Sequence, residues 1–117
     1  MTRYYFAYGS NLLPEQMRER CADAVQMGAA TLEGWRFLIN QRGVATLRNE
    51  SGSVCHGGLW RLSREDEESL DGYEGVGAGR YSKATFSVRL CGGDYVEALT
   101  YLDHRRQHGT PRPGYLA

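Results

Sequence analysis

The 117-residue chain carries 14 basic and 14 acidic residues and is 41% hydrophobic. Its length suits a single domain over residues 1–117 with one core. Its balanced charge excludes a surface that seeks nucleic acid, and no stretch is long and apolar enough to serve as a signal peptide or a membrane span. We therefore expect a cytoplasmic protein without nucleic-acid or membrane partners, whose oligomeric state is open.

The first part of the chain predicts a strand, a turn and a helix. Thr2 to Tyr8 is short and rich in aromatic residues, as in a buried strand. Gly9-Ser10-Asn11 interrupts it, and Pro14 suits the first turn of a helix that continues to Arg20. Three apolar stretches farther along are predicted to be strands: Ala29–Ile39 (as one strand or two), Val44–Leu47 and Val54–Leu62.

The second half predicts a helix and a β-hairpin. Ser63 and Asp66 resemble a capping box, so a short helix is expected to begin there and to end near Gly72. Tyr81 to Leu90 alternates polar and apolar residues, Gly92-Gly93-Asp94 forms a turn, and Tyr95 to Leu102 returns as the partner strand. Asp103 onward is polar and is predicted to be loop. The predicted fold class is α+β, with a small sheet that is closed or strongly curled.

Tyr8-Gly9-Ser10-Asn11-Leu12 forms a candidate anion site, because a strand that turns through glycine into a helix leaves backbone N–H groups unpaired. Such groups bind a carboxylate or a phosphate. The alternative is an ordinary helix cap, in which Ser10 or Asn11 bonds to the first turn.

Glu74 is the candidate acid/base. It lies between Gly72 and Gly75, after the predicted helix and before a strand. Apolar neighbours such as Val76 and Tyr81 would desolvate its carboxyl group and raise its pKa toward neutrality, as general acid/base catalysis requires. The alternative is a solvated carboxylate in a glycine-rich loop.

Taken together, these segments resemble the γ-glutamyl cyclotransferase family. Tyr8-Gly9-Ser10-Asn11-Leu12 resembles its N-terminal motif, and Glu74-Gly75-Val76 with Gly79-Arg80-Tyr81 resembles its catalytic segment. Ala98-Leu99-Thr100-Tyr101-Leu102 and Pro113-Gly114-Tyr115 match its downstream order. The resemblance implies a small mixed β-barrel with short flanking helices.

The same resemblance implies the site and its reaction. Tyr8, Gly9, Ser10, Asn11 and Leu12 are expected to bind the γ-glutamyl group, with Glu74 as the catalytic acid/base. Tyr81, Tyr101 and Tyr115 correspond to aromatic positions near the pocket, and packing in the core is their alternative role. The substrate's own α-amino group would attack the γ-carbonyl and release 5-oxoproline together with an amine or amino acid, so neither a metal nor another cofactor is expected.

Two further points stay open. Family members usually continue past the position of Tyr115 with a further segment and a helix, so we expect that segment to be missing or short here. A non-catalytic barrel domain that binds a small carboxylate metabolite is the alternative function.

The remaining residue types with possible chemistry are weaker candidates. His104 and His108 have the spacing of a helical metal pair, but Arg105, Arg106 and the nearby prolines favour a solvated loop. The adjacent residues Cys55 and His56 would point to opposite faces of a strand and so would not form a nucleophile–base pair. Trp35 and Trp60 are expected in the core or in a pocket wall. The three widely spaced cysteines predict free thiols.

Overall fold

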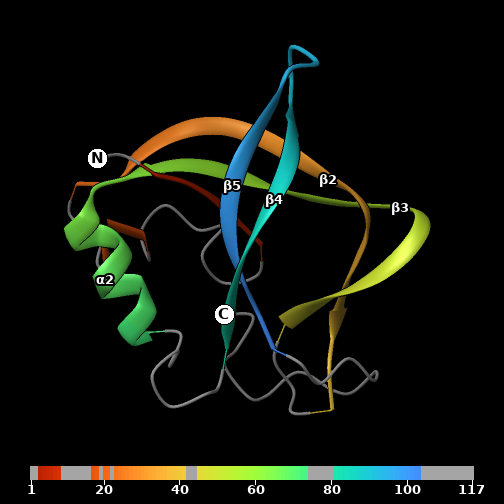
Figure 1. The fold of residues 1–117 in the computed structure, drawn as a ribbon, viewed down its shortest axis with the longest axis horizontal. Helices are drawn as coiled ribbons and strands as arrows, with labels where there is room; N and C mark the ends of the chain where they lie inside the picture. Colours follow the sequence, from red (N-terminus) through yellow and green to blue (C-terminus); the bar gives the residue numbers. More distant parts are fainter. Residues whose placement is uncertain are drawn as a thin grey trace.

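A computed structural model gives the fold of the chain. It describes residues 3–8, 17–18, 20–21, 23–41, 45–73 and 81–103, with only the backbone of Tyr73. Among these residues, five strands close into a barrel in the order β1-β3-β2-β4-β5, and one helix, α2, lies against its outer side (Figure 1). These elements are β1 (Arg3–Ala7), β2 (Val25–Ile39), β3 (Ala45–Leu62), α2 (Arg64–Tyr73), β4 (Ser82–Leu90) and β5 (Tyr95–Leu102).

The sheet is mixed, as predicted. β1 runs parallel to β5 at Tyr5 and Leu99, whereas β3 pairs antiparallel with β1 and with β2. β4 pairs antiparallel with β2 and with β5. The parallel pair closes the barrel, which confirms the predicted α+β class with a small closed sheet.

Two apolar clusters lie on the two faces of the barrel wall. Successive residues along β1 and just after it belong to the two clusters in turn, because neighbouring side chains of a strand point to opposite faces. Phe6 and Tyr8 belong to the inner cluster with side chains such as Leu47 and Val88. Tyr5 and Ala7 belong to the outer cluster. Its remaining buried members are Met17, Cys21, Trp60, Leu62, Leu70, Leu99 and Tyr101.

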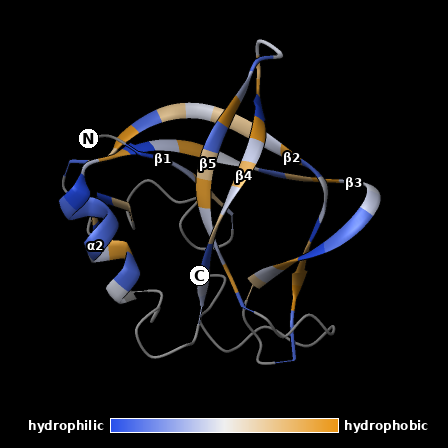
Figure 2. Cartoon of the chain, viewed as in Figure 1, coloured by the Kyte–Doolittle hydropathy of each residue, from blue (hydrophilic) through white to orange (hydrophobic). Residues whose placement is uncertain are grey.

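The outer cluster fixes α2 against the barrel. Leu70 is the fully buried apolar residue of a helix that is otherwise mostly hydrophilic (Figure 2). Met17 and Cys21 pack into the same cluster, and the Cys21 N–H donates to the Met17 carbonyl at 2.8 Å. Met17, Arg18 and Arg20 have helical backbone, inside the stretch predicted as the first helix; the rest of that stretch lies outside the described residues.

The start of α2 is a complete capping box. The Asp66 N–H donates to Ser63 Oγ at 3.2 Å, and the Ser63 N–H donates to Asp66 Oδ2 at 3.2 Å. The pair satisfies two N–H groups at the helix start, which confirms the predicted start of the helix. Within the part of the chain that the structure describes, no helix has the length and apolar character needed to cross a bilayer.

The predicted strand boundaries were right for the hairpin and wrong for the longer pair. β4 alternates as predicted, and its connection to β5 closes with a bond from the Gly93 N–H to the Leu90 carbonyl at 2.9 Å. β2 begins at Val25, four residues before the predicted start, and is a single strand. Val44–Leu47 and Val54–Leu62 are not separate strands, because Ala45–Leu62 is one continuous strand, β3.

A bulge explains the mistaken break in β3. Trp35 pairs with Asn49 but Glu33 pairs with Val54, so β3 carries extra residues at this point. Gly52 has a φ of 86°, a left-handed conformation that suits glycine. The polar stretch around it has the composition of a loop, yet it continues the strand through its curl (Figure 1).

Gly57 is required where β3 passes β1. A Cβ atom added there would contact the Ala7 carbonyl oxygen and lie 2.7 Å from Phe6 Cζ. Phe6 is fully buried in the inner cluster. Only a residue without a side chain therefore lets the two strands approach this closely.

Gly57→Ala should destabilise the protein by about 1–3 kcal/mol, because the methyl group overpacks Phe6 and the Ala7 backbone. Gly72→Ala is the matched control, since an added Cβ at Gly72 meets nothing within 4 Å. There alanine should leave stability unchanged or raise it by up to about 1 kcal/mol through helix propensity. Urea unfolding measures both variants, and an unchanged midpoint for Gly57→Ala would show that the close approach is absent.

Candidate active site at the barrel mouth

Every strand of the barrel has one end at the same opening, which we call the mouth. β1 and β5 are parallel and finish there, before Tyr8 and Asp103 respectively. Pairing of Ser82 with Leu102 places the start of β4 beside the end of β5. Pairing of Ile39 with Ala45 places the end of β2 beside the start of β3. The mouth thus consists of Tyr8, Asn40, Ala45, Thr46, Tyr81 and Asp103.

Buried polar side chains gather at the mouth. Asn40, Thr46 and Asp103 are each 0% exposed, and Thr100 is 1% exposed. Burial of polar groups is costly unless they form hydrogen bonds. Thr46 Oγ1 accordingly donates to the Asp103 carbonyl at 2.6 Å and accepts from the Asp103 N–H at 3.1 Å. These bonds tie the start of β3 to the residue that follows β5.

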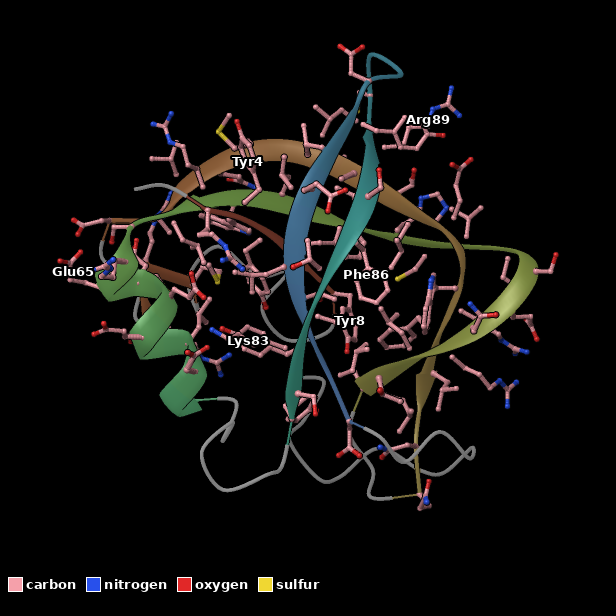
Figure 3. All side chains as sticks on the ribbon, in the orientation of Figure 1. Tyr4, Tyr8, Glu65, Lys83, Phe86 and Arg89 are labelled. Atoms are coloured by element: carbon pink, nitrogen blue, oxygen red, sulfur yellow. The ribbon has the colours of Figure 1, made fainter. Side chains whose placement is uncertain are left out.

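Tyr8 lies inside the barrel at the end of β1 (Figure 3). Its hydroxyl donates to the backbone carbonyl of Tyr101, and its ring meets Phe37 edge-on, with centroids 6.2 Å apart. The side chain is 8% exposed. Tyr8 is therefore fixed by contacts with β5 and with β2, immediately before Gly9 in the sequence.

Tyr81 fixes the start of β4. Its hydroxyl donates to the Ala45 carbonyl at 3.1 Å, and its partly buried ring packs against the outer cluster. The bond reaches β3, which is not a neighbour of β4 in the barrel. Tyr81 thus anchors the end of the segment that contains Glu74 to the mouth.

Tyr101 lies on the other side of the wall. Its ring belongs to the outer cluster, meets Tyr5 edge-on at 5.7 Å and is 2% exposed. Its hydroxyl donates to Asp71 Oδ1 on α2 at 2.8 Å. Of the predicted tyrosines, Tyr8 and Tyr81 therefore lie at the mouth, whereas the Tyr101 side chain contacts the helix.

The remaining predicted site residues lie outside the described residues. They are Gly9, Ser10, Asn11, Leu12, Glu74 and Tyr115. Their roles stay predictions, as does anion binding by the loop. The described structure supplies the points where these segments join the barrel: Gly9 follows Tyr8 at the mouth, Glu74 follows the last residue of α2, and Arg80 precedes Tyr81.

Sequence reasoning missed the buried polar layer. Asp103 was predicted to begin a polar loop, and Thr46 resembles any strand residue, yet their bonds join positions 57 residues apart. No local pattern specifies such a contact. A polar residue directly after the apolar run Ala98–Leu102 is the nearest signal that the sequence offers.

The thiols do not offer a nucleophile at the mouth. Burial, followed by the negative charge of Asp66, raises the pKa of Cys21 to about 12. Burial also raises the pKa of Cys55 to about 11, and both residues therefore stay as thiols at neutral pH. Cys55 is buried whereas His56 is exposed, which confirms that the two side chains diverge. All three cysteines are free.

Metal ligands and tryptophans add no further site among the described residues. No group of three His, Cys, Asp or Glu side chains there is arranged to hold a metal ion. His104 and His108 lie outside that part of the chain. Trp60 is 3% exposed in the outer cluster, and Trp35 packs edge-on against Phe86 at 5.0 Å, which confirms a packing role for both.

Comparison with known proteins identifies the family. A family model described as "Gamma-glutamyl cyclotransferase, AIG2-like" matches residues 5–115. The chain belongs to this family. The match includes the strands that form the mouth and the segments that join them.

Individual relatives agree with this family. The Mus musculus protein named γ-glutamylcyclotransferase is 32% identical over 124 residues, covering 97% of this chain and 66% of the mouse protein. The Homo sapiens protein of the same name is 29% identical over 121 residues, covering 95% and 64%. The chain therefore spans just under two thirds of these relatives. A solved structure titled γ-glutamyl cyclotransferase superposes with a TM-score of 0.89 at 28% identity, covering 98% of this chain and 74% of that one.

The Thr46–Asp103 bonds at the mouth predict a stability effect. Thr46→Val keeps the shape of the side chain but leaves the Asp103 N–H and carbonyl without their hydroxyl partner. The loss should be about 1–3 kcal/mol. Thr85→Val, at an exposed position of β4, is the matched control and should stay within about 0.5 kcal/mol of wild type. Equal unfolding free energies for the two variants would contradict the role of this contact.

Proposed function

We propose that the protein is a γ-glutamyl cyclotransferase, which releases 5-oxoproline from a γ-glutamyl amine or amino acid. The proposal rests on family membership and on relatives that carry this name. The observation that supports it best is the shared mouth. Tyr8, which opens the predicted binding loop, and Tyr81, which follows the predicted catalytic segment, are both held there by hydrogen bonds to backbone carbonyls.

The reaction requires no nucleophile from the protein. The substrate's α-ammonium group gives a proton to the carboxylate of Glu74, and the free amine attacks the γ-carbonyl carbon. The new C–N bond closes a five-membered ring and puts negative charge on the carbonyl oxygen. The C–N bond to the leaving group then breaks as the leaving nitrogen takes the first proton from Glu74. The Glu74 carboxylate then accepts the extra proton of the ring nitrogen, which passes to the released amine and leaves the neutral lactam ring of 5-oxoproline. One carboxyl group thus serves as base and then as acid.

The site has to bind the substrate in a folded conformation, with its α-amino group next to its γ-carbonyl carbon. Holding two reacting groups in this geometry raises the rate of their reaction. In the proposal, backbone N–H groups of Gly9–Leu12 hold the α-carboxylate, with Ser10 and Asn11 adding side-chain bonds. Backbone donors also stabilise the developing oxyanion. Tyr81 and Tyr115 are proposed to line the site around the ligand.

The buried polar layer suits this chemistry. The Thr46 hydroxyl is hydrogen-bonded to the Asp103 backbone, and the Thr100 hydroxyl to the Phe6 carbonyl, so the mouth should keep its shape when a ligand displaces water. A rigid support of this kind favours a preorganised site over one that must rearrange. Since three free thiols are typical of a reducing compartment, we propose a cytoplasmic location as well.

Glu74→Gln should lower turnover by about 10²–10⁴-fold, because the amide keeps the shape of the side chain but cannot accept the ammonium proton. Affinity for a γ-glutamyl ligand should be largely retained, since the loop binds the carboxylate. The assay measures 5-oxoproline from a panel of γ-glutamyl dipeptides, with calorimetry for affinity.

Glu97→Gln is the matched control for this variant. Glu97 is an exposed carboxylate on β5, and its replacement should leave turnover unchanged. Equal turnover of wild type and Glu74→Gln would remove Glu74 as the base. Binding without turnover in wild type, across the whole panel, would instead support a non-catalytic domain for small carboxylates.

A further inference from the structure

The last turn of α2 is attached to the barrel by one carboxylate. Asp71 Oδ1 accepts from the Tyr101 hydroxyl at 2.8 Å, and Asp71 Oδ2 accepts from Lys83 Nζ at 3.0 Å. Tyr101 and Lys83 lie directly opposite each other on β5 and β4. Two adjacent strands therefore present a pair of donors to the same acceptor. We call Asp71, Lys83 and Tyr101 the Asp71 latch.

The two bonds of the latch differ in environment. Lys83 is a surface residue that also bonds to Glu67 at 2.7 Å and points toward α2 (Figure 3). The hydrogen bond to Glu67 and, less strongly, that to Asp71 raise the pKa of Lys83, against an opposing effect of burial. Exposed ion pairs of this kind contribute little. The Tyr101 hydroxyl belongs to a 2% exposed residue, so its bond to the Asp71 carboxylate is partly shielded from water on the tyrosine side. A hydrogen bond to a charged acceptor is stronger than one between neutral groups.

The latch also complements the helix electrically. α2 has three acidic residues in its first turn and no basic residue in its last turn. Its C-terminal end therefore lacks a cation from its own sequence to balance the partial negative charge of the exposed carbonyls. Asp71 adds a carboxylate at that end, and Lys83 of β4 neutralises it through an ion pair at 3.0 Å.

Tyr101 connects the latch to the inside of the barrel. Its side chain reaches outward to Asp71, whereas its backbone carbonyl accepts from the Tyr8 hydroxyl on the inner face. The same residue thus fixes the end of α2 and the end of β1. In sequence, Glu74 comes directly after α2, and Gly9 comes directly after Tyr8.

We propose that the Asp71 latch is a positioning device, which sets the end of α2 relative to Tyr8 and thereby sets the acid/base relative to the binding loop. The inference rests on the proposed function. It assigns Asp71, which the sequence did not single out, as a positioning residue. It also assigns Tyr101 to the same role, so that its hydroxyl acts through α2 rather than on the substrate.

Tyr101→Phe tests the inference, because it removes the hydroxyl and keeps the ring and the carbonyl that Tyr8 uses. We expect kcat to fall about 10- to 100-fold, as a misplaced catalytic group does, while KM stays within about twofold. Tyr95→Phe is the matched control. It removes a hydroxyl at the other end of β5 that also donates to a carboxylate, Glu33 Oε1, at 2.6 Å. Its kinetics should equal those of wild type.

A double-mutant cycle separates positioning from two unrelated losses. Asp71→Ala should reproduce the loss in kcat, and Asp71→Ala with Tyr101→Phe should be no worse than the more damaging single variant. Two groups that act through one contact behave in this non-additive way. Asp71→Asn, which keeps an acceptor for Tyr101 but loses the charge that pairs with Lys83, should retain most of the activity.

Amide hydrogen exchange tests the latch independently of enzyme turnover. Amides in the last turn of α2 should exchange faster in Tyr101→Phe than in wild type and should not change in Tyr95→Phe. Suppose that the wild-type protein is active. An unchanged kcat in Tyr101→Phe would then overturn the positioning role of the latch, as would a loss of kcat in the double variant equal to the product of the two single losses. Either result would leave the proposed function intact. An inactive wild type would instead remove the proposed function and the positioning role with it.

Discussion

The parallel contact between β1 and β5 is the constraint on which the rest of the molecule depends. These strands come from opposite ends of the described chain, and their backbone pairing at Tyr5 and Leu99 closes the barrel. Two hydroxyls reinforce that seam by donating to backbone carbonyls across it: Thr100 Oγ1 to Phe6 at 2.8 Å, and the Tyr8 hydroxyl to Tyr101. Both bonds are buried, so water does not compete for them.

Parallel pairing has a direct consequence for the site. Because β1 and β5 run the same way, their final residues reach the same opening, and Tyr8 and Asp103 lie at one mouth. α2 begins where β3 ends and packs on the outer face of the wall through Leu70. Its last turn is bonded to β4 and β5 near that mouth. Segments far apart in sequence therefore meet around one opening. The barrel wall lies between α2, which precedes Glu74 in the sequence, and the barrel interior, which contains Tyr8.

Features that depend on neighbours in sequence could be predicted from sequence. The capping box of Ser63 and Asp66, the alternation of β4 and the turn at Gly93 are all set by residues a few positions apart. β3 was predicted as two strands because the polar stretch around Gly52 has loop composition, whereas a bulge carries it through the curl of the sheet. The Thr46–Asp103 and Asp71–Tyr101 bonds could not be predicted from the sequence, because they depend on the order of the strands in the barrel and on the position of α2. Motifs in the sequence predicted Tyr8 and Tyr81 as site residues but could not tell that Tyr101 faces the helix.

The mouth as the place where a γ-glutamyl ligand binds is the central claim, and an NMR titration tests it most directly. A γ-glutamyl dipeptide would be added to ¹⁵N-labelled Glu74→Gln protein, so that turnover does not remove the ligand. Amide signals of Tyr8, Thr46, Tyr81 and Asp103 should shift in a saturable way. Those of Gly92 and Gly93 should stay in place, because they lie in the turn at the far end of β4 and β5. Saturable shifts confined to the hairpin or to the outer surface of the barrel, with the mouth unaffected, would contradict the claim.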